Sequence, residues 1–240
     1  KSLSNSWDND LIPYYFDIIC ERNGVVPITR TQLEQRRAEM QERAAYVEII
    51  SNFKWKPEGE ALERAIESLR SLKKAFVDEV PPGYYHSKGL EAFPKLGEII
   101  TTEERFNRLV QVSKAILGGY GDPYHKLEHL AEITGLITSD DRFEKIMDLH
   151  EFYGQPEYKY VYVFDVGKEF KGLEEWISSD ARFDKMVALA TACLEGNYQL
   201  WNGFASEINR FPKHFATLSD EHLDKLLDVL IDAVKANARA

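Results

Sequence analysis

Four polar side chains that could bind a metal occur at helical spacing near the middle of the chain. They are His125, Glu128, His129 and Glu132. A helix would place these two imidazoles and two carboxylates on one face. The pattern lacks the His-Glu-x-x-His order of zinc peptidases, and a metal site between helices needs ligands from facing helices that the sequence does not identify. A solvated polar face with no metal or cofactor is favoured, and a helical metal-dependent enzyme using the His125/His129 face is the alternative.

Other catalytic patterns are absent from the sequence. There is no phosphate-binding Gly-Lys-Ser/Thr loop, no Gly-x-Gly-x-x-Gly after a strand and no Gly-x-Ser-x-Gly turn. Cys20 and Cys193 form neither a disulfide framework nor a metal-ligand pair, and both are expected to be buried free thiols. The sequence therefore leans against an enzyme, leaves that question open, and indicates no catalytic residue.

Three arginines occupy the same position of a repeated pattern. Arg105, Arg142 and Arg182 each follow acidic residues by one or two positions and precede a phenylalanine. Such a set could bind an anionic ligand or the carboxylates of a partner. The neighbouring Asp and Glu residues favour another interpretation, in which each arginine pairs with an acid of the adjacent copy.

The pattern around these arginines is an internal repeat with copies starting near residues 100, 137, 177 and 218. Aligned on Phe106, Phe143, Phe183 and Leu223, the copies are 37, 40 and 40 residues apart, within the range of helical-repeat arrays. Each copy begins with hydroxyl and acidic residues, which suit the N-cap and the first turn of a helix. The three phenylalanines are predicted to be core residues.

A second signal follows each copy and predicts a second helix. Glycine can end one helix and proline can open the next in Gly121-Asp-Pro123 and Gly154-Gln-Pro156, and Gly196-Asn-Tyr198 lies at the matching place. The second helices are expected over 123–135, 156–170 and 197–210. Residues 156–165 could also read as a strand, but an isolated strand would have nothing to pair with, so helix is favoured.

The remaining periodicity completes an all-α prediction. Apolar residues at helical spacing predict helices over 8–22, 31–53 and 58–79, and a closing helix over 219–237. We therefore expect an N-terminal helical segment, residues 1–95, followed by an acidic helical-repeat region, residues 96–240. The α-helical hairpins of this region would stack as a short solenoid, and the two parts could form one continuous domain.

The net charge of −10 is concentrated in the repeat region. Residues 1–95 carry 14 basic and 15 acidic side chains, whereas residues 96–240 carry 16 and 25, a net charge of −9. Such acidity disfavours direct nucleic-acid binding. A basic protein partner would fit, although acidity that serves solubility alone is the simpler interpretation. No stretch is long and apolar enough to span a membrane, so a soluble protein is expected.

The first residue is Lys1 rather than Met, so we expect a processed or excised piece of a longer chain. A cytoplasmic location is slightly favoured and secretion stays open. The sequence does not indicate an oligomeric state.

The expected function is non-catalytic protein binding, because stacked hairpins offer an extended surface. A specialised alternative is an acidic inhibitor or immunity-type protein that covers a nucleic-acid enzyme. Trp201 is a candidate anchor for a partner. Together with acids that are unlike helix caps, it makes up the predicted partner-binding set: Asp148, Glu151, Asp184, Trp201 and Glu207.

Overall fold

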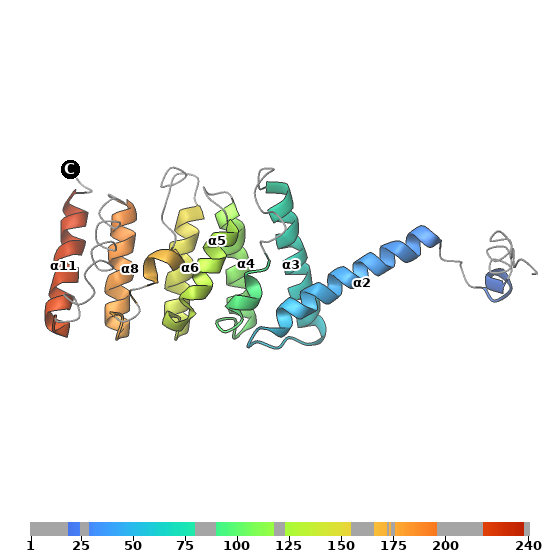
Figure 1. Cartoon of the computed structure of the whole chain (residues 1–240), viewed down its shortest axis with the longest axis horizontal. Coiled ribbons are helices and arrows are strands. Elements are labelled where there is room, and N and C mark those ends of the chain that lie inside the picture. Colours follow the sequence, from blue (N-terminus) through green and yellow to red (C-terminus); the bar gives the residue numbers. More distant parts are fainter. Residues whose placement is uncertain are drawn as a thin grey trace, which may run out of the picture. The chain divides into compact units, whose positions relative to one another are not determined.

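The computed structural model describes residues 19–24, 29–79, 90–117, 123–154, 166–171, 173, 176–195 and 218–237. Every regular element in these residues is helical, which confirms the predicted all-α class (Figure 1). The chain divides into two compact units, Lys1–Ala45 and Tyr46–Ala240. Within the described ranges, no helix combines the length and apolar character needed to cross a membrane. The predicted boundary near residue 95 stays a prediction.

The first unit holds the end of one helix and most of the next. Residues 19–22 are helical and Gly24 follows with φ of 64°, a left-handed conformation that suits glycine. The predicted 8–22 helix therefore ends where expected, and its beginning lies outside the described residues. Helix α2 spans Arg30–Ser51 and continues into the second unit. Its start is a capping box, because Thr29 and Gln32 each accept a hydrogen bond from the backbone amide of the other.

Helix α3 spans Gly59–Glu79, in agreement with the predicted helix over 58–79. Its buried stripe repeats every three or four residues, so one face of the helix is apolar. This stripe consists of Ala65, Ile66, Leu69, Leu72 and Phe76.

Four helices begin with the repeated sequence pattern and are called the motif helices. They are α4 (Glu103–Leu117), α6 (Asp140–Gly154), α8 (Asp180–Glu195) and α11 (Asp220–Asn237). The hydroxyl oxygen just before each helix accepts a hydrogen bond from the backbone amide three residues later, over 3.2–3.3 Å. This is N-cap geometry. The predicted helix starts are thereby confirmed, with the caps at Thr102, Ser139, Ser179 and Ser219.

Only parts of the predicted second helices fall within the residues that the structure describes. Helix α5 (Pro123–Glu132) and the 3-10 turn η3 (Thr134–Leu136) occupy the range predicted as 123–135. Helix α7 (Val166–Phe170) lies in the range predicted as 156–170. Residues 156–165 and the predicted helix over 197–210 lie outside the described residues.

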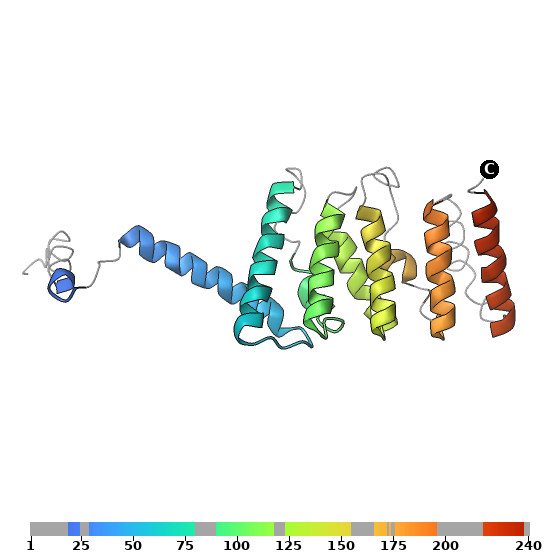
Figure 2. The same ribbon diagram turned by 180° about the vertical axis from the view of Figure 1, so that it is seen from behind.

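Within the second unit, each long helix packs against the next. Helix α3 contacts α4, α4 contacts α6, α6 contacts α8, and α8 contacts α11, as both views show (Figures 1 and 2). Helix α5 packs against α7 and against the 3-10 turn η2 (Phe93–Leu96). At Gly167 in α7 a Cβ atom would lie only 2.2 Å from the His129 carbonyl carbon, so α7 approaches α5 more closely than a larger residue would allow.

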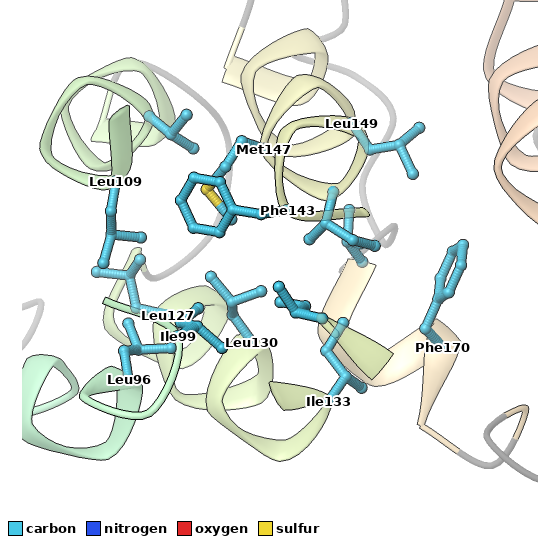
Figure 3. Packing of buried hydrophobic residues seen from close by; sticks show 14 of the residues in the cluster. Leu96, Ile99, Leu109, Leu127, Leu130, Ile133, Phe143, Met147, Leu149 and Phe170 are labelled. Atoms are coloured by element: carbon cyan, nitrogen blue, oxygen red, sulfur yellow. The ribbon is translucent and has the colours of Figure 1, made fainter. Parts of the chain in front are cut away.

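A continuous apolar core joins these helices (Figure 3). Phe106, Phe143 and Phe183 are 1%, 0% and 0% exposed, which confirms their prediction as core residues. Trp176 is also buried. The Phe106 ring faces the segment that precedes its own copy, with ring centres 5.7 Å from Phe53 and 5.5 Å from Trp55.

Replacing Phe143 by alanine should lower the free energy of unfolding by roughly 3–5 kcal/mol, because the ring is fully buried between helices. Val77 on α3 is 56% exposed and provides the control. Val77→Ala should change the free energy of unfolding by less than about 0.5 kcal/mol. Urea denaturation of both variants checks this. Equal losses from the two changes would contradict the packing described for α6.

Candidate functional site

The first turn of each of the helices α4, α6 and α8 carries an arginine. Arg105, Arg142 and Arg182, here called the arginine row, are 8%, 7% and 6% exposed. The backbone amide of each is the one that donates to the N-cap hydroxyl. The cap therefore fixes the backbone from which the guanidinium extends.

The arginine row bridges neighbouring motif helices. Arg105 Nε donates to the Asp140 carboxylate on α6 over 2.7 Å, and Arg142 Nε donates to the Asp180 carboxylate on α8 over 2.7 Å. A second nitrogen of Arg142 donates to the Leu136 carbonyl over 3.2 Å. Charged hydrogen bonds of this kind are the stronger ones in proteins. The predicted pairing between adjacent copies is confirmed.

The same guanidinium groups lie over the phenylalanine of the following copy. The Arg105 Cζ atom is 4.8 Å from the centre of the Phe143 ring, and the Arg142 Cζ atom is 4.8 Å from that of Phe183. A cation over a ring contributes about 0.5–2 kcal/mol, more where water is excluded. Each arginine thus contacts both the acid and the ring of the next copy, which accounts for their recurrence together.

The last arginine of the row has different neighbours, because Leu223 takes the place of the phenylalanine. Arg182 pairs with Asp220 at 2.9 Å and donates to Asp224 over 3.4 Å and to the Ser178 hydroxyl over 2.9 Å. Additional hydrogen bonds therefore occupy the guanidinium where a ring is missing.

A second set of ion pairs begins at Arg108 on α4. Its guanidinium meets three carboxylates of α6: Glu144 at 3.2 Å, Asp148 at 2.5 Å and Glu151 at 2.5 Å. The hydrogen bond from Arg108 holds the pKa of Glu151 below its usual value, against the opposing effect of burial. Three carboxylates around one cation leave this contact with a net negative charge.

Lysines continue this second set along the following helices. Lys145 on α6 donates to Asp184 on α8 over 2.6 Å, and Lys185 on α8 donates to Asp228 on α11 over 2.9 Å. The cation belongs to the earlier helix and the carboxylate to the later one, as in the arginine row. The connection between motif helices therefore has a constant direction along the chain.

Sequence reasoning missed the cations of this second set and also Arg64 on α3, which continues the pattern towards the N-terminus. It donates from Nε to Glu103 over 2.9 Å, and Glu103 stands in its copy where Asp140 and Asp180 stand in theirs. Helix α3 lacks the repeated motif, so nothing local marks Arg64. The available signal was the acid itself, because an acid at this position in the first copy implies a cation on the preceding helix.

The predicted partner-binding acids lie at these contacts. Asp148 and Glu151 pair with Arg108, and Asp184 pairs with Lys145. These acids therefore connect helices of this chain as well as carrying surface charge. Trp201 and Glu207 lie outside the described residues.

Two of the four candidate metal ligands on α5, Glu128 and Glu132, form ion pairs with lysines. Glu128 pairs with Lys95 in η2, and Glu132 pairs at 2.9 Å with Lys171, the residue after α7. The side chain of His125 lies outside the described residues. In the part of the chain that the structure describes, no three His, Cys, Asp or Glu side chains are grouped to hold a metal ion.

Cys20 is a buried free thiol, as expected, and the Cys193 side chain lies outside the described residues.

Comparison of the chain with protein-family models, with curated proteins and with solved structures found no match. The functional argument therefore depends on the geometry of the chain itself.

A double-mutant cycle on Arg142 and Asp180 should give a coupling free energy of roughly 1.5–3 kcal/mol, because a buried guanidinium donates to the carboxylate. The control pair is Lys225 and Glu221, whose side chains are 68% and 75% exposed and whose coupling should stay below about 0.5 kcal/mol. The variants are Arg142→Met, Asp180→Asn, Lys225→Met and Glu221→Gln, measured by chemical denaturation. Equal coupling in the two pairs would contradict the role given to the arginine row.

Replacing Arg108 by glutamine should raise the pKa of Glu151 towards its usual value, because the main cause of its lowering is removed. A carboxylate with a lowered pKa contributes stability above its usual pKa, and this contribution is lost as the pH falls through the folded-state value. The stability difference between the chain and Arg108→Gln should therefore shrink in strong acid.

Carboxyl NMR titration measures the pKa of Glu151 directly. Arg64→Gln is the matched control, since it should raise the pKa of Glu103, which Arg64 lowers, and leave that of Glu151 unchanged. A Glu151 pKa unmoved by Arg108→Gln would contradict the assigned cause.

Proposed function

We propose that the motif helices form a short solenoid of α-helical hairpins that binds a basic protein partner without catalysis. The observation that carries this proposal is the repeated ion pair between successive motif helices, in which a cation of the earlier helix binds a carboxylate of the later one. These pairs join the helices one after another in a row. A row of helices joined in this way offers an extended surface rather than a closed cavity.

The charge of the motif helices supports a basic partner. Helices α6, α8 and α11 together carry 13 acidic and 6 basic side chains, a net charge of −7. Helix α4 carries 2 acidic and 3 basic side chains, a net charge of +1. The acidity thus belongs to the last three motif helices.

The internal ion pairs leave carboxylates in contact with water. Asp148 is 69% exposed and Glu144 is 53% exposed while both pair with Arg108, and Asp228 on α11 is 57% exposed. Exposed charges of one sign accelerate the encounter with an oppositely charged partner and contribute less to the lifetime of the complex. This acidic surface is therefore suited to steer a basic protein towards the helix row.

Affinity capture with mass spectrometry would identify partners, and surface plasmon resonance would then measure their association with the chain. The association rate should fall as salt rises, because charges are screened over about 8 Å at physiological ionic strength, while dissociation should change less. The paired change Asp148→Asn with Asp184→Asn should slow association further.

The matched control is Glu60→Gln with Glu104→Gln, which removes the same charge from exposed positions on α3 and α4. Thermal unfolding first establishes that both paired variants remain folded. An association rate indifferent to salt, or equally slowed by the two pairs of changes, would contradict an acidic docking surface on the last three motif helices.

A further inference from the structure

The two sides of a motif helix have different roles in its packing. In α6, Phe143 points towards α4, where Arg105 lies over its ring at 4.8 Å (Figure 3). Leu149 leaves α6 on the other side, away from α4, and is also buried (Figure 3). In α6, one buried side chain therefore points towards the preceding motif helix and another points away from it.

The side towards the following helix is exposed in α11. In the alignment of the copies, Val229 corresponds to Val112, Leu149 and Leu189, which are 1%, 3% and 1% exposed. Val229 itself is 64% exposed. This position is buried in α4, α6 and α8, and each of these helices has a further motif helix packed against it. Helix α11 thus keeps an apolar residue at a position that is buried in the three other motif helices.

The cation of the same contact is also present in α11. Lys145 on α6 donates both to its own Asp141 and to Asp184 on the following helix, at 2.6 Å each. Lys225, at the matching position of α11, donates to its own Glu221 over 2.6 Å. An exposed ion pair of this kind contributes little to stability, so Lys225 can also bind a second carboxylate at little cost. Lys225 therefore makes the bond within its own helix that Lys145 makes, and among the described residues it has no following motif helix with which to make the second bond.

Two replacements in α11 indicate what would fit this surface. His222 stands where the arginine row has its arginines and bonds to the Ser219 hydroxyl at 2.8 Å. Asp232 stands where the inner helices have Ala115, Phe152 and Ala192. A complementary helix would thus offer carboxylates to Lys225 in its first turns, an apolar stripe to Val229, and a basic residue to Asp232 further along.

We propose that His222, Lys225, Val229 and Asp232, here called the outer face of α11, dock an acidic amphipathic helix of a partner protein. The added helix would pack on α11 as α11 packs on α8. Such docking would continue the contacts inside the chain and match the charges of Lys225 and Asp232, and recognition by one amphipathic helix is a common mode of protein binding. This site is separate from the acidic surface proposed above and does not depend on it.

A labelled peptide with the sequence of residues 220–237 is a suitable probe, since α11 itself presents Asp224 and Asp228 to a preceding helix and carries Lys235 in its last turn. Fluorescence anisotropy with the full chain should show saturable binding. Val229→Asp and Lys225→Glu in the chain should each weaken binding roughly tenfold or more, which corresponds to about 1.4 kcal/mol or above. Val77→Asp, at an exposed position of α3, is the control and should leave binding of the peptide unchanged.

Three outcomes would overturn the proposal. The first is no binding at peptide concentrations up to about 1 mM, the weak end of specific recognition. The second is binding unaffected by Val229→Asp, which would mean that the peptide replaces α11 on α8. The third is self-association of the chain that Val229→Asp abolishes in analytical ultracentrifugation, which would make a second copy the occupant. Circular dichroism establishes that the variants are folded.

Discussion

The described part of the second unit depends on a buried guanidinium that is shared between two helices. In Arg142 one nitrogen is held by the Leu136 carbonyl just before its own copy, another by Asp180 of the next copy, and the flat face lies over Phe183. A charge in the interior is tolerated only when such partners surround it. Because they belong to two copies, the contact fixes the position of one helix on the next.

The acids of these contacts stay exposed to water although the arginines that bind them are buried. Asp140, Asp180 and Asp220 are 85%, 75% and 85% exposed, while the arginines that bind them are almost fully buried. Each carboxylate therefore keeps most of its water and also lies at a helix N-terminus, where a negative charge is favoured. The cost of burial falls on the arginine, whose ring and carbonyl contacts offset it. This division lets the surface of the helix row stay acidic although its helices are joined by ion pairs.

Local signals in the sequence predicted the elements of this fold, and distant pairings were harder to predict. Caps such as Ser139 and the buried Phe143 belong to one short pattern, so helix starts and core positions follow from it. The Arg142–Asp180 pair was anticipated only because both residues recur in the repeat. Arg64 was missed because α3 lacks that repeat. The ion pair of Asp148 with Arg108 was not predicted, because the two residues lie on different helices and spacing along the chain does not specify which helices face each other.

Hydrogen exchange of the chain with Arg142→Met, followed by mass spectrometry, tests most directly whether the arginine row holds the helices in place. Exchange protection reports local opening free energy along the chain. The account predicts loss of protection in α6 and α8, on the two sides of the missing contact, with α3 and α4 retaining theirs. Unchanged protection in α8, or an equal loss across all four helices, would contradict a row built from separate arginine contacts.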